Sequence, residues 1–322
     1  MKIKVFLPYF GVEFPKTFDV LLFTMKRNTK IDFIVPTNIN FSQYESYAEN
    51  ITFVNMNLSD VKYRIESILK YTVKLKEAYK ICDFKPSFGE IFSDYLEDAE
   101  WWGYIDPDVI LGDINSFIDS VDFDMYERVL SWGHLTFYKN TDYVNKLWRK
   151  EWGLEGIVPS IKEVSTRNTP FYFDEKGQGK GYGYGIIYAQ RKLNALKAYE
   201  NVEFIADVSP GKFNFWVRGE EQVKYFKVLK NNKLYGYFED GSKKEYLYVH
   251  LQKRSMENKL SGSIPDEFYI YPNVIDRELF TVSKDEQKEL WEKDKKRRDL
   301  KRKLGNIKVA YFLKKFKYRK LI

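Results

Sequence analysis

The chain has 322 residues, of which 44% are hydrophobic and 18% aromatic, so it can build a large core and is not globally disordered. Its single cysteine, Cys82, excludes an internal disulfide and a cysteine-based metal site. The net charge is +7, but residues 293–320 alone hold 14 Lys or Arg and two acids, a net of +12, which leaves about −5 for the rest. The positive charge therefore belongs to a C-terminal segment.

The first 110 residues alternate between strand-like and helix-like segments. In chain order, the apolar pattern predicts a strand at 2–7, strands at 31–35 and 51–54, a helix at 59–69, a second helix over 88–95 and a strand at 101–105. A turn signal follows the first strand, and Pro36 is expected to stop the second. This alternation predicts an α/β fold with a mostly parallel sheet.

The second half of the chain shows strand-like runs at shorter spacing. They lie at 129–132, 135–138, 225–229, 234–238 and 246–251. This spacing predicts antiparallel pairing, and hence a mixed sheet overall. A glycine-rich loop occupies residues 174–185, and the composition shifts to Lys, Arg and Glu from Ser283. We therefore expect one folded domain at 1–283 and a basic tail at 284–322.

The sequence Asp106-Pro107-Asp108 follows the strand predicted at 101–105. Two carboxylates at this spacing point to opposite faces of an extended chain, but a bend at Pro107 lets both reach one ligand. Carboxylate oxygens suit Mg²⁺ or Mn²⁺, and ligands of open α/β sheets bind beyond the carboxyl ends of strands. The pattern favours a metal site, although a solvated turn can have the same sequence. Asp113 is expected to cap the following helix.

His250 closes the strand predicted at 246–251 and is followed by Lys253 and Arg254. A histidine at a strand end can complete a metal site, and neighbouring cations can stabilise a departing diphosphate. The alternative is an ordinary core or surface histidine beside solvated basic residues. For His134, the other histidine of the chain, we expect a buried structural role in preference to a donor contact.

Two further pairs of charged residues are candidates for the site. Lys85 could pair with a phosphate and Asp83 with a sugar or ribose; an ordinary helix-surface pair is the alternative. Asp174 and Glu175 lie at the start of the glycine-rich loop, where one of them could contact the acceptor or donor sugar or, in an inverting enzyme, act as a general base. An acidic loop tip in solvent is the alternative. The glycines would let this loop order over a bound donor, or they form a mere flexible connection.

Taken together, these segments resemble the GT-A glycosyltransferases, most closely a bacterial family of glycosyltransferase-like proteins found with capsular and exopolysaccharide genes. The matching segments occur in the family's order and span residues 5–254, about three-quarters of the chain. They are Leu7–Gly11, Lys80–Pro86, Trp102–Ile114, Gly133–Thr136, Phe173–Glu175 and His250–Arg254.

The resemblance implies a GT-A-like fold with a mixed, mostly parallel sheet flanked by helices, and Mn²⁺ or Mg²⁺ as cofactor. The residues it implies for the site are Pro8, Tyr9, Phe10, Gly11, Asp83 and Lys85 for the nucleotide, Asp106, Asp108 and His250 for the metal, Asp106 also for ribose or diphosphate, and Lys253 and Arg254 for the diphosphate. One departure concerns the basic residue, which lies two positions after Asp83 where related sugar transferases place it three positions after. In several retaining members a late histidine is a metal ligand, so His250 points to a retaining outcome by analogy.

The basic tail is predicted to be helical and mixes apolar with cationic residues after Gly305. This composition is typical of a helix lying on an anionic membrane surface, where each Lys or Arg contributes on the order of 1 kcal/mol. A solvated charge run is the alternative, and the acidic body argues against nucleic-acid binding. The start of the chain does not resemble a signal peptide, and no run of about 18 apolar residues occurs. We expect a cytoplasmic protein, peripheral on the inner face of the cell membrane.

The sequence thus predicts a metal-dependent glycosyltransferase. It would move a hexose from a nucleotide-diphosphate sugar, expected to be UDP-linked, to a surface polysaccharide or lipid-linked glycan acceptor. Two alternatives remain open: a metal-dependent sugar-phosphate or nucleotidyl transferase, and a non-catalytic, membrane-associated protein that retains the transferase fold.

Overall fold

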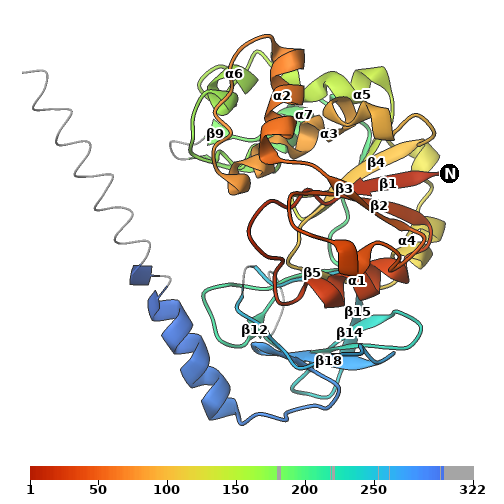
Figure 1. Cartoon of the computed structure of the whole chain (residues 1–322), viewed down its shortest axis with the longest axis vertical. Coiled ribbons are helices and arrows are strands. Elements are labelled where there is room, and N and C mark those ends of the chain that lie inside the picture. Colours follow the sequence, from red (N-terminus) through yellow and green to blue (C-terminus); the bar gives the residue numbers. More distant parts are fainter. Residues whose placement is uncertain are drawn as a thin grey trace, which may run out of the picture.

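A computed structural model describes residues 1–179, 183–217, 219, 222–252, 254–260, 262–297 and 299–300. Figure 1 shows a large sheet with helices on both of its faces, and further strands below it that include β12, β14 and β18. The predicted α/β class is confirmed. Among the described residues, no helix combines the length and hydrophobicity that crossing a membrane requires.

The first sheet has seven described strands in the order β10-β6-β7-β4-β1-β2-β3. In chain order they are β1 (Ile3–Phe6), β2 (Ile31–Thr37), β3 (Ile51–Asn55), β4 (Trp101–Ile105), β6 (Arg128–Trp132), β7 (Leu135–Lys139) and β10 (Ala198–Tyr199). Four of the neighbouring pairs are parallel, whereas β7 runs antiparallel to both β4 and β6. The prediction of a mixed, mostly parallel sheet is confirmed for this part of the fold.

Helices cover both faces of this sheet and bury two separate apolar clusters against it (Figure 1). One face carries α2 (Leu58–Leu69), α3 (Phe88–Ile91), α5 (Asp142–Lys146), α6 (Ile161–Ser165) and α7 (Ile186–Lys192), and the other carries α1 (Phe18–Lys26) and α4 (Ile114–Ser120). Helix α2 buries Val61 and Ile65, one turn apart, which is the helical spacing seen in the sequence. Asp113 caps α4 by accepting a hydrogen bond from Ser116 N at 2.9 Å, as predicted.

Two local predictions differ from the structure. Strand β2 continues through Pro36 to Thr37, because the Pro36 carbonyl accepts a hydrogen bond from Tyr9 N at 2.9 Å and so keeps this end of the strand paired. The helix predicted over 88–95 is the short α3 followed by a 3-10 turn at Ser93–Tyr95. A longer 3-10 segment, Ala78–Ser87, precedes it.

Two further sheets complete the described fold. The first is a three-stranded sheet in the order β11-β16-β5, formed by β5 (Val109–Leu111), β11 (Ile205–Asp207) and β16 (Tyr248–His250). The second is largely antiparallel and contains β12 (Phe215–Trp216), β13 (Gln222–Val228), β14 (Leu234–Phe238), β15 (Lys243–Tyr246), β17 (Glu257–Asn258), β18 (Phe268–Tyr271) and β19 (Val274–Asp276). The strands predicted at 225–229 and 234–238 are β13 and β14, whereas the run predicted at 246–251 is divided between β15 and β16.

The remaining elements are short. They are the hairpin β8 (Gly177–Gly179) and β9 (Gly183–Tyr184), and 3-10 turns at Ser42–Tyr44, Phe123–Met125 and Leu147–Arg149. Residues 284–297 form a helix, which Figure 1 shows in blue beside the lower sheet. This helix contacts the body, because Ser255 Oγ donates to Asp294 Oδ2 at 3.0 Å and the rings of Trp291 and Phe213 lie 6.1 Å apart. The predicted tail beyond residue 300 lies outside the described residues.

Candidate functional site

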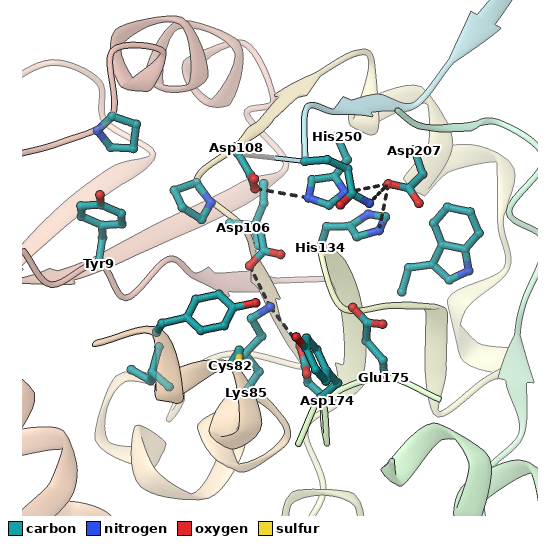
Figure 2. A pocket seen from close by; sticks show the side chains of 18 of the residues that line it. Tyr9, Cys82, Lys85, Asp106, Asp108, His134, Asp174, Glu175, Asp207 and His250 are labelled. Carbon is teal, nitrogen blue, oxygen red and sulfur yellow. Dashed lines mark hydrogen bonds and ion pairs between the residues drawn. The ribbon is translucent and has the colours of Figure 1, made fainter. Parts of the chain in front are cut away.

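A cleft of about 1400 Å³ opens at the carboxyl ends of β1 and β4, where ligands of open α/β sheets bind. Several of the residues singled out in the sequence line this cleft. They are Pro8, Tyr9, Phe10, Lys85, Asp106, Asp108, Asp174, Glu175, His250 and Arg254. Figure 2 shows Lys85, the four acidic residues and His250 converging from different parts of the chain.

Asp106 and Asp108 both face the cleft, although they lie only two residues apart. Asp106 follows β4, and its backbone N–H donates to the carbonyl of His134 at 3.1 Å. The chain then turns at Pro107 and enters β5, and the carbonyl of Asp108 accepts from Leu251 N at 2.8 Å. The side chains of Asp106, Asp108 and His250 offer ligand atoms that lie within 4.8 Å of one another.

His250 lies between two carboxylates and is 8% exposed (Figure 2). Its Nε2 is 3.3 Å from Asp108 Oδ1, and its Nδ1 is 2.9 Å from Asp207 Oδ1. Burial alone would lower the pKa of His250, but hydrogen bonds to Asp108 and Asp207, together with the charge of Asp106, raise it to about 10. Without a bound cation, the imidazole is therefore itself the positive charge among these carboxylates.

Lys85 links Asp106, in the group formed with Asp108 and His250, to Asp174 of the second acidic pair. Its Nζ lies 2.7 Å from Asp106 Oδ1 and 3.0 Å from Asp174 Oδ2, and it donates to the carbonyl of Gly133 at 2.7 Å. Burial alone would lower the pKa of Lys85, but the charges of Asp106 and Asp174 raise it well above its usual range. The side chain is therefore a permanent cation inside the cleft, and not the exposed helix-surface residue of the alternative reading.

Asp174 and Glu175 lie across the cleft from Asp108 and His250 (Figure 2). Burial raises the pKa of Asp174 to about 8, although the charge of Lys85 opposes the shift. Desolvation within the cleft also raises the pKa of Glu175, although this residue is largely exposed. Carboxyl groups with pKa values moved towards neutrality are suited to accept or donate a proton in catalysis. Gly133 leaves room for both carboxylates, since a Cβ there would lie 2.7 Å from both Asp174 Oδ2 and Glu175 Oε1.

Asp83 occupies a different place from the predicted nucleotide contact. It is 1% exposed and does not line the cleft. Its carboxylate accepts hydrogen bonds from Phe171 N at 2.9 Å, Phe173 N at 3.0 Å and Lys80 Nζ at 2.6 Å. Asp83 therefore clamps the segment that leads into Asp174, and a direct contact with a nucleotide does not fit this geometry.

The turn after β1 reaches the cleft only in part. Pro8, Tyr9 and Phe10 line it, whereas Gly11 lies at a smaller neighbouring hollow. Gly11 is bound there by Asn38, whose side chain accepts from Gly11 N at 3.0 Å and donates to Gly11 O at 2.9 Å. The predicted nucleotide contact is therefore compatible with the first three residues of the turn and not with Gly11.

Arg254 lines the cleft, but its guanidinium binds the protein backbone. It donates to the carbonyls of Phe213 at 2.7 Å, Ser209 at 3.0 Å and Asn214 at 3.2 Å, and also to that of Lys212. Through these bonds Arg254 holds the 209–214 loop. A guanidinium engaged in this way is poorly placed for the predicted contact with a diphosphate. Lys253, the other predicted diphosphate contact, lies outside the described residues.

Sequence reasoning missed Asp207, whereas for His134 it predicted a buried structural role, and this residue is 5% exposed. Both line the cleft, and the His134 ring stacks on that of His250 with centroids 4.0 Å apart. His134 Nδ1 is also 2.9 Å from the hydroxyl of Tyr248. The only sequence signal for Asp207 is the short apolar run before it, which forms β11.

The donor set fits a divalent cation of the Mg²⁺ or Mn²⁺ type. Asp106 and Asp108 supply hard carboxylate oxygens and His250 supplies Nε2, with Nδ1 held by a carboxylate as is usual for metal-bound histidines. Two other groups among the described residues also have metal-ligand spacing, namely His134–Asp207–His250 and Cys82–Asp83–Asp174. The latter is the poorer fit, because both of its carboxylates pair with a buried lysine, whereas in the group of Asp106, Asp108 and His250, Lys85 pairs with Asp106 and the ligand nitrogen of His250 itself faces Asp108.

Comparisons with known proteins give weak structural likenesses and one family. No curated protein sequence matches the chain. A structure of the galactosyltransferase LgtC with donor and acceptor sugar analogues is 13% identical, covers 66% of this chain and 77% of that chain, and has a TM-score of 0.35. An active-site mutant of LgtC is 12% identical, with coverages of 79% and 88% and a TM-score of 0.38. The glycosyltransferase GlyE of Streptococcus pneumoniae is 10% identical, with coverages of 63% and 46% and a TM-score of 0.34.

Because these TM-scores lie below 0.5, any functional proposal depends on the site and not on the structural likenesses. The sequence match is more extensive, since residues 5–278 match a family described as a family of unknown function, DUF6625. This stretch contains every candidate residue of the cleft. The chain belongs to the DUF6625 family.

Proposed function

We propose that this protein is a metal-dependent glycosyltransferase that uses a nucleotide-diphosphate sugar. The observation that carries the proposal is the convergence of Asp106, Asp108 and His250 at the carboxyl ends of the strands, inside a cleft of about 1400 Å³. A divalent cation held there would neutralise the charge of the donor's diphosphate. The cleft is also large enough for a donor and part of an acceptor, because ligand pockets typically measure about 300–1000 Å³.

The other charged residues of the cleft have roles that follow from their positions. Lys85 bridges Asp106 and Asp174 with a buried positive charge, so it can stabilise negative charge that develops between the two acidic groups. Asp174 and Glu175 supply carboxyl groups whose pKa values are raised by desolvation, and we assign them to the sugar or to the proton of the acceptor hydroxyl.

The finer identity of the substrates follows the resemblance seen in the sequence. The proposed donor is a UDP-linked hexose, the acceptor is a surface polysaccharide or lipid-linked glycan, and the stereochemical outcome is retention. The proposed location is the cytoplasmic face of the cell membrane, because residues 293–320 carry a net charge of +12 that anionic lipids would attract. Removing residues 301–322 should shift the protein from anionic vesicles to the supernatant in a sedimentation assay.

The proposal is tested by thermal shift with a panel of nucleotide-sugars and nucleoside diphosphates, with and without Mn²⁺. We expect one nucleotide class to raise the Tm only when Mn²⁺ is present, because ligand binding to the native state stabilises it. The Asp108→Ala variant should lose this shift. If no nucleotide raises the Tm, the transferase proposal fails and a non-catalytic binding protein becomes the better account.

A further inference from the structure

Asp207 lies directly beside His250 because of strand pairing. Strands β11 and β16 are parallel, and Asp207 and His250 are register partners at their carboxyl ends. The backbone holds this arrangement just beyond the pair, where Val208 N donates to the carbonyl of His250 at 3.1 Å. The two side chains are therefore neighbours through the sheet itself and not through a flexible loop.

The contact between them fixes which nitrogen of His250 faces the aspartates. Nδ1 of His250 donates to Asp207 Oδ1 at 2.9 Å, so Nε2 is the atom that faces Asp108 Oδ1, 3.3 Å away (Figure 2). A histidine that ligates a metal usually donates its other ring N–H to a carboxylate or carbonyl, which sets its tautomer and its orientation. Asp207 occupies that place.

The environment of Asp207 also favours an orienting role over direct ligation. Its Oδ1 accepts a second hydrogen bond, from Gln252 Nε2 at 2.6 Å. His134 lies on the other side, with its ring stacked on His250 and its Nε2 4.0 Å from the same oxygen. An oxygen that already accepts from two donors is poorly placed to bind a cation as well. The stacked ring of His134 further restricts rotation of His250.

We propose that Asp207 is a positioning residue that holds His250 with Nε2 directed at the cation site formed with Asp106 and Asp108. The inference rests on the proposed metal-dependent function and adds to it a residue that the sequence did not identify. It also says which of the two candidate metal-binding groups that share His250 holds the cation. The group with Asp106 and Asp108 binds the cation, and the group with His134 and Asp207 supports it.

The test is Mn²⁺ binding, measured by electron paramagnetic resonance of free Mn²⁺ with the full chain and no nucleotide. We expect Asp207→Leu to weaken the Mn²⁺ affinity about 10- to 100-fold, the usual effect of removing such a partner. Asp207→Asn keeps an acceptor oxygen and should cause a smaller loss. The control is Asp294→Asn, which removes one negative charge from the same cleft at a side chain that accepts a hydrogen bond from Ser255 Oγ, and it should change the affinity less than threefold.

A second readout reports on the imidazole itself. The chain has only two histidines, so ring ¹⁵N labelling gives two sets of signals, and His134→Gln assigns them. With Mg²⁺ bound, the Nδ1 proton of His250 should be protected from exchange in the wild type. It should become exchangeable in Asp207→Leu, or in Asp207→Asn to a lesser degree. This readout does not depend on activity and is compared at equal folded fraction.

The outcomes separate this inference from the proposed function. If Asp108→Ala abolishes Mn²⁺ binding while Asp207→Leu leaves it unchanged, Asp207 does not position His250, and the metal site stands. If Asp207→Leu abolishes binding while Asp108→Ala retains it, the cation binds the group with His134, and the inference is wrong. If the wild type does not bind Mn²⁺ at millimolar concentration, the metal-dependent function fails, and this inference fails with it.

Discussion

The Asp83 clamp gives a prediction that can be worked out from the structure. Asp83 and Lys80 form a buried pair at 2.6 Å, with side chains 0% and 1% exposed, and the carboxylate also accepts from Phe171 N and Phe173 N. Asp83→Ala would leave the Lys80 charge buried without its carboxylate. Breaking a buried ion pair in this way costs about 3–5 kcal/mol. For a chain of this size, that corresponds to a fall in Tm of roughly 6–20 °C, at about 2–4 °C per kcal/mol.

The assay is urea denaturation followed by tryptophan fluorescence, in which Asp83→Ala is compared with a double variant that removes both charges. The pair Lys80→Met and Asp83→Leu, made together, should recover a large part of the loss, since apolar replacement of a buried ion pair is often close to neutral. The control is Asp142→Ala, which breaks the ion pair between Asp142 and Lys146. The side chain of Asp142 is 82% exposed, so this variant should lose at most about 1 kcal/mol of unfolding free energy. A loss below about 1 kcal/mol in Asp83→Ala would refute the clamp. A nucleotide affinity that falls while stability is unchanged would restore the predicted nucleotide contact.

Three further predictions concern the cleft. Because desolvation raises the pKa of Asp174 to about 8 and also raises that of Glu175, a general base in this pair becomes active only as it deprotonates. The rate of sugar transfer should therefore rise with pH towards about 8. This ascending limb of the pH–rate profile should shift or vanish in Glu175→Gln or Asp174→Asn. An ascending limb near pH 4 in the wild type would contradict the prediction. Gly133→Ala should lower kcat/KM by roughly 100-fold, because the added Cβ would displace the carboxylates of Asp174 and Glu175, and a misplacement of about 1 Å has an effect of that size. A kcat/KM within threefold of wild type would show that these carboxylates can shift without loss of activity. Arg254→Ala should lower the free energy of unfolding by about 3 kcal/mol in urea denaturation, because the guanidinium donates to carbonyls of the 209–214 loop, and it should change the KM for the donor little. A raised donor KM with unchanged stability would instead support a contact between Arg254 and the diphosphate.

Much of the fold could be predicted because its strands are apolar runs of the length that a buried parallel strand needs. Strand β4 is buried along its whole length and was placed at its observed bounds. Helix α1 gave no comparable signal, since six of its nine residues are buried and its outward face is narrow, with Phe23 between the charged Asp19 and Lys26. The division between β15 and β16 was also missed, because an unbroken apolar run carries no mark where the chain leaves one sheet for another.

The candidate site was predictable only where its residues carry a local motif. Asp106 and Asp108 follow a strand and flank a proline, and His250 ends another strand, so their positions marked them as candidates. Asp207 could not be found in this way, since its role comes from its pairing with His250 across 43 residues of chain. Asp83 was misplaced for a similar reason, because the sequence does not reveal that it is buried beneath residues 171–173.

The most direct test of the central claim is product analysis after incubation of the protein with Mn²⁺, a nucleotide-sugar panel and a glycan acceptor. The account predicts release of a nucleoside diphosphate together with a glycosylated acceptor, and loss of both in Asp108→Ala. Release of pyrophosphate or a nucleoside monophosphate would contradict it in favour of a nucleotidyl or sugar-phosphate transferase. The absence of any product, from a protein that binds neither Mn²⁺ nor nucleotide, would contradict the enzyme altogether.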